Sequence, residues 1–427
     1  MRTTRFERDA VRGIRIHVLP TDRFKTTAIS VFVGALLQEQ TVTPIALTPF
    51  VLRRGNRTHP ETKAFREALD SLYGAGFGFD IYKRGDYQIV NFRMDVIGNE
   101  FASGGEPLLQ EAIAFLGETL SQPAMEDGRF RAAYVESEKH TVQKKLEAIV
   151  NDKGRYAAER CIEEMCKDEP YRLHPLGQKE ALAPITPDSL YASYRTWLSQ
   201  APIDVYVVGN TTLEEVKARI EASFAIERAE RPSEYTFGGE RKQVGEVRTV
   251  VERMDVGQGK LNMGLRAPTT YAQPNYATAL VYNGILGSFP HSKLFLNVRE
   301  RESLAYYASS RLDGHKGIMT IQSGIEIENY ERAVAIIRKQ LDAMKAGDIS
   351  ELEMSQTKAM ISNHLRELND NAYEMIGYDF NTVLSGKERT TEALLSDVER
   401  VAVDDIVRFA EGVQLDTIYF LRDRKEA

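Results

Sequence analysis

Apolar and polar residues follow one another along the first half of the chain in a pattern that predicts both strands and helices. The alternation from Ile14 to Val18 is typical of a strand with one buried face, and a second strand-like run at 27–33 follows after a turn. Apolar residues then recur at helical spacing over 60–74, where a proline suits the first turn and a glycine the C-terminal cap. A strand at Val90–Val96 and a helix over 106–120 complete this series.

The second half of the chain repeats this order of elements. A strand is predicted at 261–265, followed by an apolar helix around 279–285. Two alternating runs, 306–312 and 317–325, flank an Asp-Gly pair and therefore predict a hairpin. The segment 331–347 has one apolar face and ends in a glycine, as a helix does. The repetition indicates an internal duplication of one α+β unit.

The boundary between the halves is marked by the segment 229–243, which is polar, holds a proline and a Gly-Gly pair, and shows no periodicity. We expect a linker there, between an N-terminal domain at 1–228 and a C-terminal domain at 244–427. A long helical region is predicted over 130–166. The fold class that follows is α+β, with two homologous domains, each an antiparallel sheet with helices packed on one face.

Composition and charge exclude several classes of partner. The chain has 427 residues with a net charge of −7 and no long basic run, which argues against nucleic acid or an anionic membrane as the main partner. No apolar stretch of about 18 residues occurs, so we expect no membrane span. The charged start predicts no signal peptide, and Cys161 and Cys166 suit two free thiols on a helix. We therefore expect a cytoplasmic protein.

The most specific stretch is residues 291–312, HSKLFLNVRERESLAYYASSRL. It follows GILGSFP, a glycine-containing segment that we expect to form a turn, and its first part has an apolar helical face. Arg299 lies near the end of this helix, and Tyr306 lies seven positions later, where the next strand begins. A guanidinium and a phenol are both strong donors to a carbonyl oxygen. Aimed at one point, the pair could stabilise the oxyanion that develops during peptide hydrolysis.

The pattern S-K-L-F-x-x-V-R-E-x-x-x-L-A-Y within this stretch resembles the C-terminal motif of the pitrilysin/insulinase-type zinc peptidases, which include the mitochondrial processing peptidases. The resemblance covers nearly the whole chain. It implies that Arg299 and Tyr306 hold the backbone of a substrate peptide next to a zinc ion, although Arg301 could compete for the role of Arg299. It also implies that the two domains form half of a clamshell around an enclosed chamber.

Members of that family bind zinc through H-x-x-E-H on an N-terminal helix and through a glutamate on a later helix. In this chain Ala46, Pro49 and Phe50 stand at the three positions of H-x-x-E-H. Lys145 stands at the place of the third ligand, and Glu147 is the only nearby carboxylate, two positions out of register. Alanine and phenylalanine cannot bind a metal, and we expect Pro49 to interrupt or restart the helix. We therefore expect this chain to bind no cofactor.

The histidines support the same expectation without any alignment. The chain has seven, and the two nearest in sequence, His291 and His315, are 24 positions apart, so no helical pair at i and i+4 exists. The sequence also has no G-x-S-x-G elbow, P-loop or dinucleotide-binding fingerprint.

The resemblance implies a partner, because chains of this length hold two of the four repeat units that close the chamber. We expect a non-catalytic, substrate-binding subunit of a heterodimeric zinc peptidase, inactive alone, which supplies Arg299 and Tyr306 to a homologous H-x-x-E-H subunit. The zinc would lie in that partner, and the substrate would be a peptide added as a strand to a sheet edge of the partner. Two alternatives stay open: a structural or interaction subunit of a larger assembly, and an independent hydrolase with an unrecognised site.

Overall fold

The computed structural model describes residues 5–102, 107–236, 242–302 and 304–424. Contacts divide the chain into two compact units, and each unit takes segments from both halves of the sequence. The first unit consists of Met1–Glu147, Leu173–Tyr235 and Asn371–Phe380, and the second of Ala148–Arg172, Thr236–Asp370 and Asn381–Ala427. The division of the sequence at the linker 229–243 stays a prediction, and 237–241 of that linker lie outside the described residues.

Six strands form the sheet of the first unit, in the order β1-β2-β8-β3-β5-β4. Their bounds are Glu7–Val11 (β1), Ile14–Pro20 (β2), Thr26–Leu36 (β3), Gly76–Arg84 (β4), Tyr87–Ile97 (β5) and Ile203–Gly209 (β8). The predicted strands in β2, β3 and β5 are confirmed. All neighbouring strands are antiparallel except β2 and β8. We predicted an antiparallel sheet, but the sheet is mixed. A long helical crossover precedes β8, and such a connection allows β8 to pair in parallel with β2.

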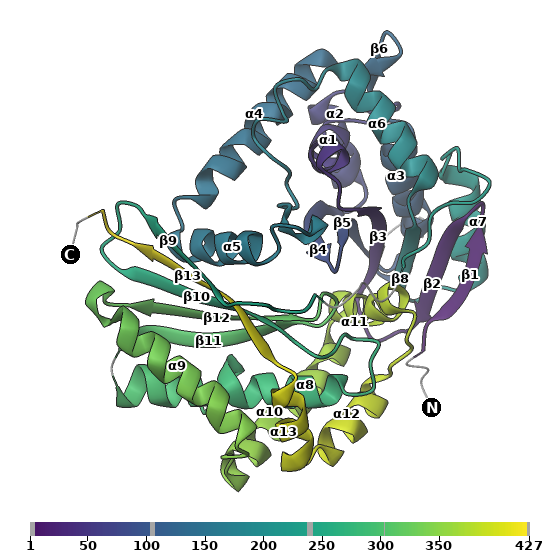
Figure 1. The fold of residues 1–427 in the computed structure, drawn as a ribbon. Coiled ribbons are helices and arrows are strands. Elements are labelled where there is room, and N and C mark those ends of the chain that lie inside the picture. The colour runs from purple at the N-terminus through teal and green to yellow at the C-terminus, as the bar shows by residue number, and fades with distance from the viewer. Residues whose placement is uncertain (1–4, 103–106, 237–241, 303, 425–427) are drawn as a thin grey trace. The chain divides into compact units, whose positions relative to one another are not determined.

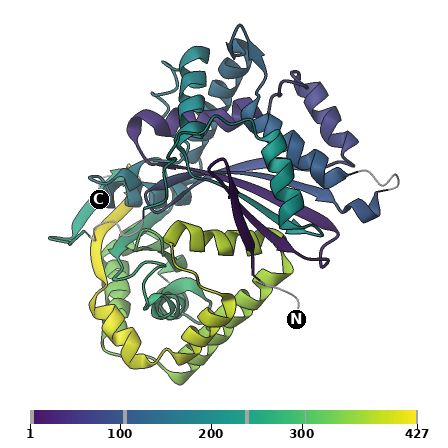
Figure 2. The same ribbon diagram turned by 90° about the vertical axis from the view of Figure 1, so that its right-hand side faces the viewer.

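Helices of the first unit gather on one face of this sheet (Figures 1 and 2). They are α1 (Glu39–Leu52), α2 (Thr62–Ser71), α3 (Leu108–Ser121), α4 (Ala132–Ile149), α6 (Pro187–Gln200) and α7 (Leu213–Ser223). Alternate residues of β3, namely Ile29, Val31 and Val33, belong to the hydrophobic core on this face. A small hairpin of β6 (Met125–Glu126) and β7 (Arg129–Phe130) precedes α4.

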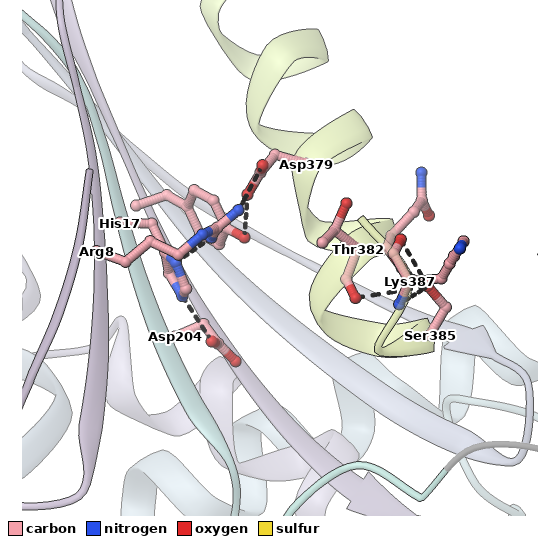
Figure 3. A network of polar contacts seen from close by, with 9 residues as sticks. Arg8, His17, Asp204, Asp379, Thr382, Ser385 and Lys387 are labelled. Atoms are coloured by element: carbon pink, nitrogen blue, oxygen red, sulfur yellow. Dashed lines mark hydrogen bonds and ion pairs between the residues drawn. The ribbon is translucent and has the colours of Figure 1, made fainter. Parts of the chain in front are cut away.

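The opposite face of the sheet is covered as well, by the beginning of α11 (Ala372–Ser385). Phe32 points to this side, because it alternates with the core residues of β3, and its ring stacks on Phe380 with centroids 3.9 Å apart. Polar contacts add to this packing, since Arg8 and Tyr206 donate to the carboxylate of Asp379 at 2.7 and 2.8 Å (Figure 3). The prediction of helices on one face alone is therefore incomplete.

A buried polar network continues from Arg8 into the sheet (Figure 3). Arg8 donates to Nδ1 of His17, and since arginine can only donate, the ring proton of a neutral His17 lies on Nε2. That nitrogen lies 2.8 Å from Oδ1 of Asp204, and Arg15 forms a bidentate pair with the same carboxylate at 2.7 and 2.6 Å. Burial of Asp204 would raise the pKa of its carboxyl, but the hydrogen bonds from His17 and Arg15 outweigh burial and lower that pKa.

Five strands form the sheet of the second unit, in the order β11-β12-β10-β13-β9. Their bounds are Arg248–Arg253 (β9), Gly259–Arg266 (β10), Ala305–Asp313 (β11), Ile318–Ile325 (β12) and Gln414–Arg422 (β13). The predicted strand at 261–265 and the hairpin of β11 and β12 are confirmed. Here β9 and β13 are the parallel pair, and the other neighbours are antiparallel.

Helices of the second unit lie on both faces of its sheet (Figure 1). One face carries α8 (Tyr276–Asn283), α9 (Tyr330–Lys345), α10 (Glu351–Glu367), α12 (Thr391–Arg400) and α13 (Val403–Glu411). The other face carries α5 (Lys153–Met165), whose Ala157 and Cys161 pack in one buried cluster with Tyr419 and Leu421 of β13. Each sheet is thus covered on its second face by a helical segment from the other half of the sequence.

The two strand orders support the predicted duplication. The order β4-β5-β3-β8-β2 in the first unit matches β11-β12-β10-β13-β9 in the second, and each sheet has its parallel pair at the same end of this series. β1 is the extra strand of the first sheet. In this correspondence β4 and β11 are equivalent edge strands.

The long helical region predicted over 130–166 is two helices, α4 and α5, separated by residues 150–152. Asp152 caps α5, because its carboxylate accepts a hydrogen bond from the backbone N–H of Arg155 at 3.0 Å. Short 3₁₀ helices lie at Asn99–Phe101, Pro170–Arg172, Ile327–Asn329 and Leu368–Asp370. Within the described ranges, no helix is long and apolar enough to cross a membrane.

Candidate functional site

Arg299 lies in a wide helical turn, Phe295–Arg301, that has π-helical hydrogen bonding. Leu294 and Val298 are fully buried and anchor this segment, which confirms the apolar face predicted for it. The Arg299 guanidinium lies 4.5 Å from the centre of the Phe295 ring, and its Nε is 3.6 Å from Glu300. The side chain is 42% exposed, so its donors are accessible to a ligand.

Tyr306 is the second residue of β11, where the pairing with β12 is irregular. Ala305 pairs with Ile325 and Tyr307 with Gly324, so Tyr306 has no partner residue and forms a bulge. A bulge redirects its side chain, and Tyr306 is 61% exposed although it belongs to a strand. Its hydroxyl donates to the carboxylate of Glu326, and this bond raises the pKa of the phenol. The phenol therefore keeps its proton at neutral pH and can serve as a donor.

The two sequence-predicted residues thus belong to adjoining elements, since the helical turn of Arg299 packs against β11. Ser303, between them, lies outside the described residues. Arg301 is turned toward its own helix, where it donates to Asn297 at 3.0 Å. Sequence reasoning missed Glu326 as the acceptor of the Tyr306 hydroxyl. The register of the predicted hairpin could have indicated it, because Glu326 directly follows the residue that pairs with Ala305.

The segment GILGSFP is not the turn that we predicted. Residues Gly284–Ser288 continue α8 as a second π-helical stretch, and this stretch packs against β11. Gly287 explains the close approach, because a Cβ at this position would lie 2.5 Å from the backbone nitrogen of Ser310. The helix and the strand can therefore pack closely only if residue 287 has no side chain.

The degenerate zinc positions lie on α1, which runs unbroken through both Pro44 and Pro49. The prediction that Pro49 interrupts or restarts the helix is wrong. A proline inside a helix costs about 3 kcal/mol, but the residues from Val42 to Leu52 are almost all buried, and this packing holds the helix. Ala46 is fully buried and Phe50 is 3% exposed, so both are packing residues of the core.

The position of the third ligand offers no metal site either. Lys145 on α4 lies with its ammonium 6.0 Å from the centre of the Phe50 ring. Glu147 is occupied elsewhere, since it accepts from Gln143 at 3.0 Å and pairs with Lys179. In the part of the chain that the structure describes, no three His, Cys, Asp or Glu side chains cluster as metal ligands do. These residues do not fit zinc.

We expect the purified chain to hold no stoichiometric zinc, because an alanine, a phenylalanine and a lysine replace three ligands. Elemental analysis after dialysis measures this directly. A matched thermal-denaturation series with added zinc provides the control, since an ion that binds only the folded chain raises the melting temperature. One zinc per chain together with such a rise would contradict the expectation.

Comparison with known proteins agrees with this picture. A family model described as the peptidase M16 inactive domain matches residues 184–361. The chain is similar to the probable inactive metalloprotease YmfF of Bacillus subtilis (strain 168). The two are 38% identical over 415 residues, which cover 97% of each chain. The fold of this chain is similar to a conserved protein from Enterococcus faecalis V583, with a TM-score of 0.91, 31% identity and 99% of each chain covered.

A peptidase M16 inactive domain from Pseudomonas fluorescens has a TM-score of 0.80 over 98% of each chain, and at 15% identity it supports the fold alone. The similarity to the Bacillus subtilis protein extends over almost the whole length of both chains, and the positions that should bind zinc carry residues that cannot. The chain therefore belongs to the peptidase M16 family, among its inactive, metalloprotease-like members.

Proposed function

We propose that this inactive metalloprotease-like chain is the substrate-binding subunit of a heterodimeric zinc peptidase that processes peptides. One contrast carries the proposal. The zinc positions are filled by Ala46, Phe50 and Lys145, whereas Arg299 and Tyr306 are present and exposed. A chain that had lost every role in peptide hydrolysis would have no need to present these two donors on adjoining elements.

In this role the partner would hold the zinc, which would supply Lewis-acid chemistry for the hydrolysis. Arg299 offers a planar set of N–H donors, and Tyr306 offers one O–H that is now directed at Glu326. Both can bond to carbonyl oxygens of an extended peptide, provided that the Tyr306 hydroxyl turns away from Glu326. We place this activity in the cytoplasm, because Cys161 is a buried free thiol, as is usual in reducing compartments.

The proposal predicts a stoichiometric partner. Affinity purification of the tagged chain from its own cells should recover a homologous protein of similar length that carries H-x-x-E-H and one zinc. Peptide hydrolysis is expected from the complex and not from either subunit alone, because each holds part of the site. Recovery of the chain alone, or as a homodimer without zinc, would contradict the proposal.

A second candidate is a structural or interaction subunit of a larger assembly. The contacts of the two donors favour it, since Arg299 stacks on Phe295 and the Tyr306 hydroxyl already has Glu326 as an acceptor. In that case the pair would stabilise only its own surroundings. Substitution of both residues would then leave any peptidase activity of the assembly unchanged.

A further inference from the structure

A pocket of about 320 Å³ lies in the first unit, beside the degenerate zinc positions. α1, β4 and α4 contribute most of its lining, including Phe50, Arg53, Phe77, Phe79, Asp80 and Lys145. Three aromatic rings and two cationic side chains thus surround one small space. Its volume is at the low end of the range for ligand pockets, about 300–1,000 Å³, and suits a single residue of a peptide.

The charges around this pocket are unbalanced. Arg53 lies 5.2 Å and Lys145 6.0 Å from the centre of the same Phe50 ring. The ammonium group of Lys145 makes no hydrogen bond or ion pair with any residue that the structure describes. Arg53 reaches only the buried carboxylate of Glu138, at 3.5 Å, and shares it with Arg54 at 3.3 Å.

The carboxylate on the other side of the pocket does not restore the balance. Asp80 forms an ion pair with Arg93 at 2.5 Å, so its charge is already compensated. The single carboxylate of Glu138 faces two arginines, so one of the two positive charges is not neutralised there. The charge of Lys145 is not neutralised by an ion pair either. Because both side chains line the pocket, an anion bound there could accept hydrogen bonds from both.

β4 brings a second feature to the pocket. It is the edge strand of its sheet and pairs only with β5, so its outer backbone groups face no other strand of the sheet. Gly78, in the middle of β4, has no atom within 4 Å of the place where a Cβ would stand. The face of β4 is therefore open at Gly78, and the backbone groups along its outer edge could pair with an added strand.

We infer that this pocket binds the C-terminal residue of a peptide. The terminal carboxylate lies between Arg53 and Lys145, the last side chain packs on Phe50, Phe77 and Phe79, and the preceding residues run along β4. A C-terminal residue carries a carboxylate and an apolar side chain on the same Cα, which matches the pairing of cations and rings here. An internal Asp or Glu would supply the charge but leave the aromatic lining unfilled. Neither Arg299, Tyr306 nor a zinc-binding partner is needed for this site.

The test uses the isolated full-length chain and an uncharged octapeptide that ends in leucine, with fluorescein at its N-terminus. Fluorescence anisotropy should show that the free acid binds about 10- to 100-fold more tightly than the same peptide with a C-terminal amide, as expected for loss of a charge-assisted hydrogen bond. An amidated peptide with an internal glutamate should bind as weakly as the plain amide.

Lys145→Met should weaken binding of the free acid by a similar factor, because among the described residues the ammonium has no hydrogen-bond or ion-pair partner that its loss would leave unpaired. Lys144→Met, at the neighbouring exposed position on α4, is the matched control and should bind as the parent does. Equal affinity for acid and amide, tight binding of the internal glutamate, or no binding of any peptide would overturn the inference.

Discussion

Arg299→Ala and Tyr306→Phe, each introduced alone into the assembled peptidase, are expected to lower kcat/KM by about 100- to 1,000-fold, the usual effect of removing one donor to a developing oxyanion. Tyr306→Phe keeps the ring and removes only the hydroxyl, so a loss of activity would belong to that donor. Arg299→Lys should restore little, because an ammonium cannot reproduce the planar set of N–H donors. Steady-state kinetics on a peptide substrate of the complex measure these losses.

The controls come from neighbouring residues of the same type. Arg301→Ala should change kcat/KM little, because its guanidinium is bonded to Asn297. Tyr307→Phe is the matched control for the phenol, since Tyr307 pairs regularly with β12. Arg299→Ala, Tyr306→Phe and the two control variants should unfold at nearly the same temperature as the parent, because none of them removes a fully buried side chain. Unchanged activity in both Arg299→Ala and Tyr306→Phe would favour the structural role, and a loss confined to Arg301→Ala would move the function to that residue.

The local pattern of the sequence was sufficient to predict most strands of the two sheets, but not β1, β4 or β9, and not how the units are assembled. Alternation at 14–18 and 90–96 identifies strands because those strands have a strongly buried face, and the repeated order of elements indicates the duplication. No local signal shows that 371–380 joins the first unit or that α5 joins the second. Those contacts connect residues far apart in sequence, such as Phe32 and Phe380, whose types suit many other positions equally well.

The candidate site could likewise be predicted only in part from the sequence. The motif locates Arg299 and Tyr306, because their order and spacing are properties of the sequence alone. The bulge at Tyr306 depends on the register between two strands, and the continuity of α1 through Pro49 depends on packing around the helix. The cationic pocket escaped prediction for a similar reason. Arg53 and Lys145 are distant in sequence and line one pocket only because the fold brings α4 beside Phe50 of α1.

Asp204→Asn is expected to lower the free energy of unfolding of the first unit by about 3–5 kcal/mol, the usual cost of breaking a buried ion pair by removing one partner. The carboxylate is fully buried and compensates Arg15 while it accepts from His17. Asparagine has nearly the same shape but carries no charge, so Arg15 loses its counter-ion and His17 loses an anionic acceptor. Urea unfolding followed by the fluorescence of Trp197 measures the effect, because this sole tryptophan is buried in the first unit.

The pH dependence of this loss identifies its cause. The folded-state pKa of Asp204 is lowered, so its contribution is fully present above the unfolded pKa of about 3.9 and is lost as the pH falls through the folded pKa. Parent and Asp204→Asn should therefore differ most at neutral pH and converge below about pH 4. Asp9→Asn is the matched control, because Asp9 is an exposed carboxylate bonded to Lys217, and it should destabilise the chain far less than Asp204→Asn does. If the loss in Asp204→Asn persisted undiminished in acid, the cause would be altered packing and not the buried charge.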